Sequence, residues 1–211
     1  MTAEQERNQK LAATGIKSLE ERHFEAYYCE TKEEAKEKIL SFIKYEDAIG
    51  WGGSSTMVQL GVMEEIKSGK YPNILNRDIA QGNERLELMQ KSLLADVFLS
   101  GTNALTEDGQ LFNIDANGNR IAALAFGPKT VIVAAGINKI VKTEQDAISR
   151  CRNLAAPINA QRFELKTPCK EKGICMNCKS QDSICCSFLQ TRLCHPAKRI
   201  KVIIIGENLG F

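Results

Sequence analysis

The chain has little net charge, no long apolar run and no leader-like beginning. Of its 211 residues, 28 are Lys or Arg and 26 are Asp or Glu, which leaves a formal net charge of +2. Such a balance does not favour nucleic acid or a membrane surface as the main partner. No stretch approaches the roughly 20 apolar residues of a membrane span. Thr2–Arg7 is charged and lacks the apolar core of a signal peptide. We therefore expect a cytoplasmic protein without a membrane partner.

Two common nucleotide-binding motifs are also missing, although the segment Gly50–Thr56 (GWGGSST) is rich in glycine. A P-loop needs lysine directly after its last glycine, and Ser54 follows Gly53 here. The dinucleotide fingerprint needs a third glycine at the position that Ser55 occupies. Neither an ATPase nor an ordinary NAD-binding protein is the first interpretation.

Alternating helical and strand patterns organise most of the chain. Strands are expected at 25–29, 47–51, 95–100, 110–114, 129–135 and 201–205, and helices at 3–21, 31–43, 55–67, 83–94, 120–126 and 143–154. Residues 71–75 are expected to form a loop that enters a short strand. Near-continuous Val and Ile runs between helices are typical of parallel strands that are buried on both faces. The sequence predicts an α/β fold, in which a mostly parallel sheet carries helices on both faces.

The segment Gly50–Thr56 follows an expected strand and precedes an expected helix. Glycine lets the backbone turn tightly and approach a ligand closely, and the first amides of a helix lack partners within the helix. These amides, with the hydroxyls of Ser54, Ser55 and Thr56, form a possible cradle for a phosphate or carboxylate. A capped turn without a ligand is an equally open interpretation.

A second loop follows the expected strand that ends at Ser100. Ligands of parallel sheets bind at the carboxyl ends of the strands, so both loops are expected to face one cleft. Lys139, after the strand 129–135, is placed to meet an anion or else to lie on the surface. The candidate ligand-binding residues are Gly50, Gly52, Gly53, Ser54, Ser55, Thr56, Gly101, Thr102, Asn103, Asn113 and Lys139.

Three segments now resemble a known group of proteins. Gly50–Thr56, Ser100–Asn113 and Ala125–Val141 are similar to the loops and following strand of the NagB/RpiA/CoA-transferase-like superfamily. Across nearly the whole chain, including Arg199–Phe211, the sequence resembles the LUD-domain group of LutC/YkgG-like lactate utilization proteins. The resemblance implies a component of lactate oxidation to pyruvate that works beside iron–sulfur partner proteins. It is also compatible with a homo-oligomer.

The chain departs from the enzymes of this superfamily at their catalytic positions. Ser100 and Asn103 stand where the sugar-phosphate isomerases carry aspartates, and Asn113 stands at their lysine. Serine and asparagine side chains cannot act as general bases, although an asparagine can stabilise an oxyanion. Asn103 and Glu107 are the remaining catalytic candidates, and both are weak. Glu107 lies among turn-forming residues, which is typical of a solvated loop carboxylate. A transferase or isomerase with an unrecognised base and a metal-held interaction scaffold are the alternative functions.

Six of the eight cysteines lie within 26 residues near the C-terminus. In a reducing compartment such a cluster more often holds a metal than forms disulfides. Cys175 and Cys178 have the tight spacing of a zinc knuckle, while the whole pattern does not match ferredoxin spacing. The predicted ligands are Cys169, Cys175, Cys178 and Cys185, with Cys186 and Cys194 as alternatives.

Zinc is the first interpretation of this cluster, and an iron–sulfur cluster has weaker support. A redox-active tail and simply packed thiols remain open. We expect residues 167–196 to form a Cys-rich insertion in a domain made of 1–166 and 197–211. The insertion is basic, but Phe188 is its only aromatic residue, so RNA binding is not favoured.

Overall fold

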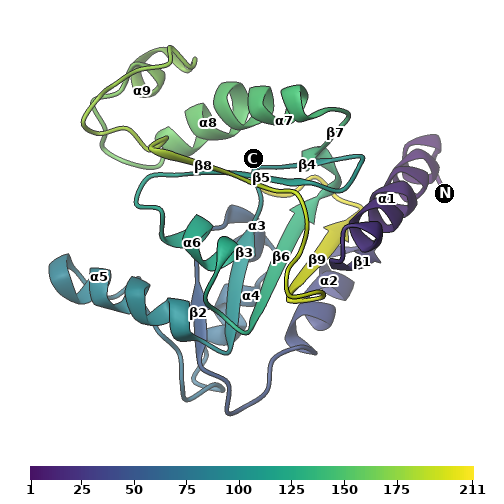
Figure 1. Ribbon diagram of the computed structural model, residues 1–211, viewed down its shortest axis with the longest axis horizontal. Helices are drawn as coiled ribbons and strands as arrows, with labels where there is room; N and C mark the ends of the chain where they lie inside the picture. The colour runs from purple at the N-terminus through teal and green to yellow at the C-terminus, as the bar shows by residue number, and fades with distance from the viewer.

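The computed structural model describes all of residues 1–211, and its centre is a five-stranded parallel sheet (Figure 1). The strands lie in the order β1-β9-β6-β3-β2. They are β1 (Glu25–Cys29), β2 (Ile49–Trp51), β3 (Val97–Gly101), β6 (Thr130–Gly136) and β9 (Ile200–Ile205). The central strands β6 and β9 are almost wholly buried, which accounts for their uninterrupted Val and Ile runs.

Helices cover both faces of this sheet, as the sequence predicted. On one face, α2 (Lys32–Leu40), α3 (Ser55–Gln59) and α4 (Val62–Ile66) enclose a core of 19 buried residues. On the other, α1 (Ala3–Glu21) and α6 (Asn119–Ala125) contribute to a core of 16. The helix α5 (Gly82–Lys91) and a short 3-10 turn, η1 (Ser92–Leu94), precede β3. No helix is long and apolar enough to cross a bilayer.

A second sheet of four strands was largely missed by the sequence analysis. Its order is β7-β4-β5-β8, and only β5 (Leu111–Asp115) was expected. The others are β4 (Ala104–Thr106), β7 (Ile140–Val141), which follows a 3-10 turn η2 (Ile137–Lys139), and β8 (Ser187–Thr191). Strands of two or three residues are too short to show a period in the sequence. The short strand expected within 71–75 amounts to one isolated bridge between Ile49 and Ile74.

The edge strand β8 comes from the Cys-rich segment 167–196. It pairs antiparallel with β5 over five residues, from Ser187 opposite Asp115 to Thr191 opposite Leu111. A short helix, α9 (Pro168–Lys172), begins the same segment. The segment is therefore joined to the rest of the fold by a ladder of backbone hydrogen bonds.

Two helical predictions were wrong in their extent. The expected helix 55–67 is broken at Gly61, whose φ of 67° ends α3 and starts α4. The expected helix 143–154 is longer: α7 (Glu144–Arg150) continues through a π turn (η3, Cys151–Ala155) into α8 (Ala156–Ala160). The π turn accommodates Pro157, which lacks an amide proton and would otherwise stop the helix.

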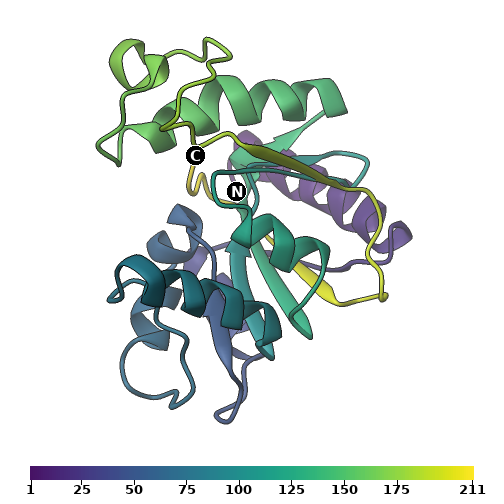
Figure 2. The ribbon, with the colours of Figure 1, turned by 60° about the vertical axis from the view of Figure 1, so that its left-hand side comes forward.

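The second sheet lies between the large sheet and the α7–α8 helix (Figures 1 and 2). Its far face packs on α7 and η3 through a small core made of Ala104, Phe112, Ile114, Ala147 and Cys151. Its near face contributes Leu105 and Leu111 to the core beneath α1. This layering holds the loop after β3 in place over the large sheet.

The turn between β4 and β5 provides a test of this layering. Gly109 has a φ of 86°, and a Cβ built there would lie 2.6 Å from the carbonyl carbon of Ser18 in α1. Gly118 has a similar φ of 81° but nothing within 4 Å. We expect G109A to lower the free energy of unfolding in urea by about 1–3 kcal/mol more than G118A. Equal losses for the two variants would contradict the packing of this turn on α1.

Candidate functional site

A cavity of about 660 Å³ lies at the carboxyl ends of β2 and β3. Gly52–Ser55 line it from the β2 side, and Gly101–Asn103 line it from the β3 side. The two strands are parallel neighbours, so their following loops meet at one edge of the sheet. Its volume lies within the range of small-molecule sites.

Most of the predicted ligand-binding residues line this cavity, and some do not. Lys139 is among the lining residues. Gly50, Thr56 and Asn113 are buried behind the wall and do not line it. Glu107 lies on the β4–β5 turn, where its amide donates to the carbonyl of Val141, away from the cavity.

The glycines of the first loop are required largely by close packing. A Cβ on Gly50 would lie 2.7 Å from Cβ of Ser92, and one on Gly52 would lie 2.7 Å from Cγ of Arg120. A Cβ on Gly101 would lie 2.7 Å from Oγ of Ser54. These three glycines therefore make room for other side chains of the protein.

The start of α3 is capped and yet keeps free amides. Ser54 accepts a hydrogen bond from the Met57 amide at 3.2 Å, which is the capping role considered from the sequence. The amides of Gly53, Ser54 and Ser55 donate to no acceptor of the protein. All three residues line the cavity, so their donors are available to a ligand.

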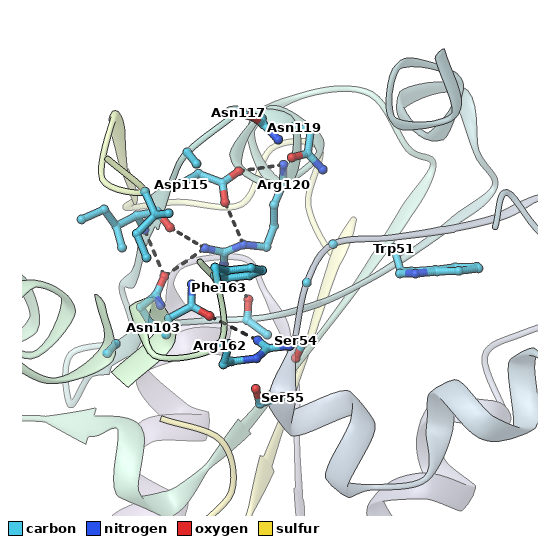
Figure 3. A pocket seen from close by; sticks show the side chains of 18 of the residues that line it. Trp51, Ser54, Ser55, Asn103, Asp115, Asn117, Asn119, Arg120, Arg162 and Phe163 are labelled. Atoms are coloured by element: carbon cyan, nitrogen blue, oxygen red, sulfur yellow. Dashed lines mark hydrogen bonds and ion pairs between the residues drawn. The ribbon is translucent and has the colours of Figure 1, made fainter. Parts of the chain in front are cut away.

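Arg120 holds the second loop together (Figure 3). Its side chain is only 8% exposed, and each of its N–H donors has a partner. The guanidinium donates to three side-chain oxygens and two backbone carbonyls, which belong to Asp115, Asn113, Asn103, Gly101 and Ile114. Because its donors are saturated, Arg120 supports the site and has none left for a ligand.

This arrangement fixes the two asparagines. Oδ1 of Asn103 accepts from Arg120 at 3.0 Å and from the Ile114 amide at 3.0 Å. Oδ1 of Asn113 also accepts from Arg120, which leaves its buried Nδ2 without a partner. The carbonyl oxygens of both predicted ligand-binding asparagines are therefore used within the protein.

Arg77 is the opposite case. Its side chain is 10% exposed and lines the cavity, but its guanidinium makes no hydrogen bond to the protein, and Nε is a buried donor without a partner. Its nearest carboxylate oxygen, Oδ1 of Asp78, is 3.8 Å from Nε. Nη2 lies 3.5 Å from the position of a Cβ on Gly53, so the cation faces the glycine loop. Burial lowers the pKa of Arg77, but an arginine remains charged at neutral pH.

Lys139 is a second buried cation of the cavity wall. Its Nζ donates to Oγ1 of Thr56 at 2.9 Å and to the carbonyl of Thr102 at 3.0 Å. Burial, together with the charges of Arg150 and Arg120, lowers the pKa of Lys139 to about 7. An anion beside this amine would stabilise its charged form.

The remaining lining residues make the cavity cationic. Six basic side chains and three carboxylates line it, the basic ones being Lys67, Arg77, Arg85, Arg120, Lys139 and Arg162. Arg162 lies between the rings of Phe163 and Phe211, 5.6 and 5.8 Å from their centroids. Trp51 turns away from the polar residues (Figure 3), and its indole donates to Asp78 at 3.1 Å. It therefore anchors the loop to the core.

Two of the three carboxylates that line the cavity accept hydrogen bonds from the protein. Asp115 accepts from the backbone amide and the guanidinium of Arg120. Asp78 accepts from Trp51 and Lys67; burial would raise its pKa, but these hydrogen bonds outweigh burial and hold the pKa below its usual range. Asp78 therefore lacks the raised pKa of a carboxylate that acts as a general base near neutrality. Glu164 is exposed.

The predicted metal ligands gather at a separate place. Cys169, Cys175, Cys178 and Cys185 line one small cavity of about 60 Å³. Burial, and then the neighbouring thiols, raise the pKa of Cys185 to about 11. Cys186 is exposed, and Cys194 is buried in the core beneath α1. As the side chains are placed, no group of three His, Cys, Asp or Glu residues could hold a metal ion.

The sequence analysis missed the two arginines that define the site. Arg77 lies in an irregular stretch between α4 and α5, where no periodicity marks a residue as buried. Arg120 begins a short helix, where an arginine ordinarily faces solvent. The one available signal was Gly52, whose missing Cβ makes room for Arg120.

Removal of Arg120 tests its structural role. R120M leaves Asn103, Asn113 and Asp115 without their shared donor, so we expect a loss of about 3–5 kcal/mol in the free energy of unfolding. The exposed Arg162 is the control, and R162M should change that free energy by less than about 0.5 kcal/mol. Comparable urea midpoints for both variants would show that Arg120 is not the support described.

Lys139 makes stability depend on pH. Its pKa of about 7 in the folded protein lies below the ordinary value of 10.5, so the unfolded chain binds more protons between these pH values. Its contribution to stability therefore rises from pH 7 towards 10. The difference in unfolding free energy between wild type and K139M should grow over this range. K142M, at an exposed lysine, should show no such growth. Parallel pH curves for wild type and K139M would contradict the assignment.

Comparison with known proteins agrees with the fold. The structure is similar to that of a DUF162 family protein from Deinococcus radiodurans, with a TM-score of 0.55 and 11% sequence identity. The alignment covers 94% of this chain and 98% of that protein's chain. A likeness at this identity shows a shared fold alone. No curated protein matches the chain. The LUD domain family matches residues 13–205. The chain therefore belongs to the LUD domain family.

Proposed function

We propose that this LUD domain binds a small organic anion in the cavity between the Gly52–Ser55 and Gly101–Asn103 loops. We further propose that it serves lactate utilization, as a cytoplasmic component beside iron–sulfur partner proteins. The role in lactate oxidation rests on the family, whereas the anion site rests on the residues of the cavity.

The buried guanidinium of Arg77 carries the proposal. A buried charge without a hydrogen-bonded partner costs stability, and native proteins retain such groups mainly at functional sites. Arg77 has no hydrogen bond to the protein, and its Nη2 faces the loop at Gly53. A carboxylate or phosphate oxygen at this point would receive charge-assisted hydrogen bonds from Arg77.

Two further groups of donors surround the same position. The free amides of Gly53–Ser55 line the cavity next to Arg77. Lys139 closes the other end of this loop through its hydrogen bond to Thr56. An anion at this position would face the backbone amides of Gly53–Ser55 on one side and the cations Arg77 and Lys139 on the other sides. This arrangement favours a ligand with more than one acceptor oxygen.

The size of the cavity bears on the ligand. At about 660 Å³ it is much larger than a three-carbon acid such as lactate or pyruvate. A larger anion, such as a sugar phosphate or part of a CoA ester, would fill more of it. The ligands to be tested therefore include these classes as well as lactate and pyruvate.

Binding is better supported than carboxylate-based catalysis. The superfamily's transferases and isomerases use a free carboxylate, but Asp78 and Asp115 are engaged by neighbouring donors. Glu107, the weak candidate from the sequence, does not line the cavity. The carboxylates nearest the two loops are thus not free to act as the base that the transferase or isomerase alternative needs, and binding is proposed first.

The variant R77M separates ligand binding from stability. We expect its affinity for the bound anion, measured by calorimetry, to fall about 10- to 100-fold, because a hydrogen bond to a charged group is worth about 1.5–3 kcal/mol. Arg77 has one long ion-pair contact, to Asp78, and no hydrogen bond, so removal of its buried charge should leave the free energy of unfolding equal to or above that of wild type.

R192M, at an exposed arginine outside the cavity, is the matched control and should bind like wild type. The proposal fails if no anion among lactate, pyruvate, sugar phosphates and CoA esters binds wild type. It also fails if R77M and R192M bind equally well.

A further inference from the structure

The segment from Pro168 to Leu193 contains no buried residue, although it forms α9 and β8. Hydrogen bonds join its start to its middle: the Lys166 amide donates to Asp182 at 2.8 Å, and Ser180 donates to the Lys166 carbonyl at 3.0 Å. Only Cys185 and Leu189 of this segment pack, partly buried, against the hydrophobic cores. A segment with so little apolar burial has little of the usual source of stability, and small structures of this kind commonly depend on disulfides or a metal.

Four thiols meet inside this segment. Cys169 comes from α9, Cys175 and Cys178 from the loop that follows, and Cys185 from the approach to β8. All four line the cavity of about 60 Å³. Their side chains are neither fully buried nor fully exposed, and all are free thiols. We call these residues the thiol cluster.

The other cysteines of the region are excluded by their positions. Cys186 is exposed, and its thiol donates to the Ser183 carbonyl at 3.2 Å. Cys194 is buried, where its sulfur accepts from the Ile200 amide at 3.3 Å. Neither lines the cavity of the thiol cluster. Four cysteines of this region thus converge and two do not, and four is the number of ligands in a tetrahedral tetrathiolate site.

We propose that the thiol cluster binds one Zn²⁺ ion through four thiolates. Each thiol loses its proton when its sulfur bonds to zinc, so a neutral cluster and Zn²⁺ give a site of charge −2 and release protons to solvent. Arg152 lines the same cavity, and Lys170, Lys172 and Lys179 lie in the same segment. These cations offset the negative charge of the site.

The thiols have to move closer together for this, because no three of them are now arranged to hold a metal ion. Cys169, Cys175 and Cys178 can move without repacking a core, because they lie in a stretch with no fully buried residue. Cys185 packs against the small core that contains Phe112 and Cys151, so it is the thiol held in place. Zinc is preferred to an iron–sulfur cluster because the spacing of the four cysteines, Cys-x5-Cys-x2-Cys-x6-Cys, does not match a ferredoxin pattern.

A zinc ion here would fasten the segment to the wall of the anion cavity. Arg152, Ala156 and Pro157 line the cavity of the thiol cluster, and Ala156 also lines the large cavity. Phe188, another lining residue, lies on β8. The site would therefore connect α8 and the edge strand β8. The inference does not depend on the identity of the bound anion.

Elemental analysis of the full chain, purified under reducing conditions and incubated with zinc, provides the first test. We expect about one zinc ion per chain and no acid-labile sulfide. Cobalt in place of zinc should give the thiolate-to-metal absorption of a tetrahedral site. C178S should lose most of the metal, whereas C186S should keep it.

A second measurement needs no variant, so it remains decisive if C178S does not fold. Chelation of the zinc should speed trypsin cleavage after Lys170, Lys172 and Lys179 at least about tenfold, because local opening governs proteolysis. The proposal is overturned if the reconstituted chain holds no zinc, if it holds iron with sulfide, or if C186S loses as much metal as C178S. Unchanged cleavage after chelation would also overturn it.

Discussion

The site depends on one saturated guanidinium. Arg120 uses all its N–H donors to join the loop after β3 to β5, and it leaves space for itself only because residue 52 is a glycine. Because the donors of Arg120 are all used within the protein, Arg77 is the buried arginine of the cavity whose donors remain for a ligand. Arg120 supports the loop and Arg77 is left to bind the ligand, and this difference is the physical basis of the proposed anion site.

The groups that lower the stability of the fold lie at the proposed anion site. A buried guanidinium without a hydrogen bond and a lysine whose pKa falls to about 7 both oppose folding, and both line the same cavity. The parallel sheet, with cores on both faces, supplies the stability that tolerates them. An anion in the cavity would relieve both costs together, so ligand binding and stability are linked at this site.

The sequence could predict the parallel sheet, because long Val and Ile runs such as that of β6 are typical of strands buried on both faces. It also placed the Gly52–Ser55 loop at a strand end, where the cavity lies. Of the second sheet it predicted β5 alone: β4 and β7 are too short to show a period, and β8 buries none of its residues fully. Arg77 and Arg120 were missed because their burial arises from contacts between segments distant in the chain, and local sequence does not record such contacts.

Anomalous diffraction from crystals soaked in selenate tests the central claim most directly. The account predicts a selenium peak in the large cavity, within hydrogen-bond distance of the Arg77 guanidinium and of the Gly53–Ser55 amides. A cavity without selenium would contradict it, above all if Arg77 were instead hydrogen-bonded to side chains of the protein.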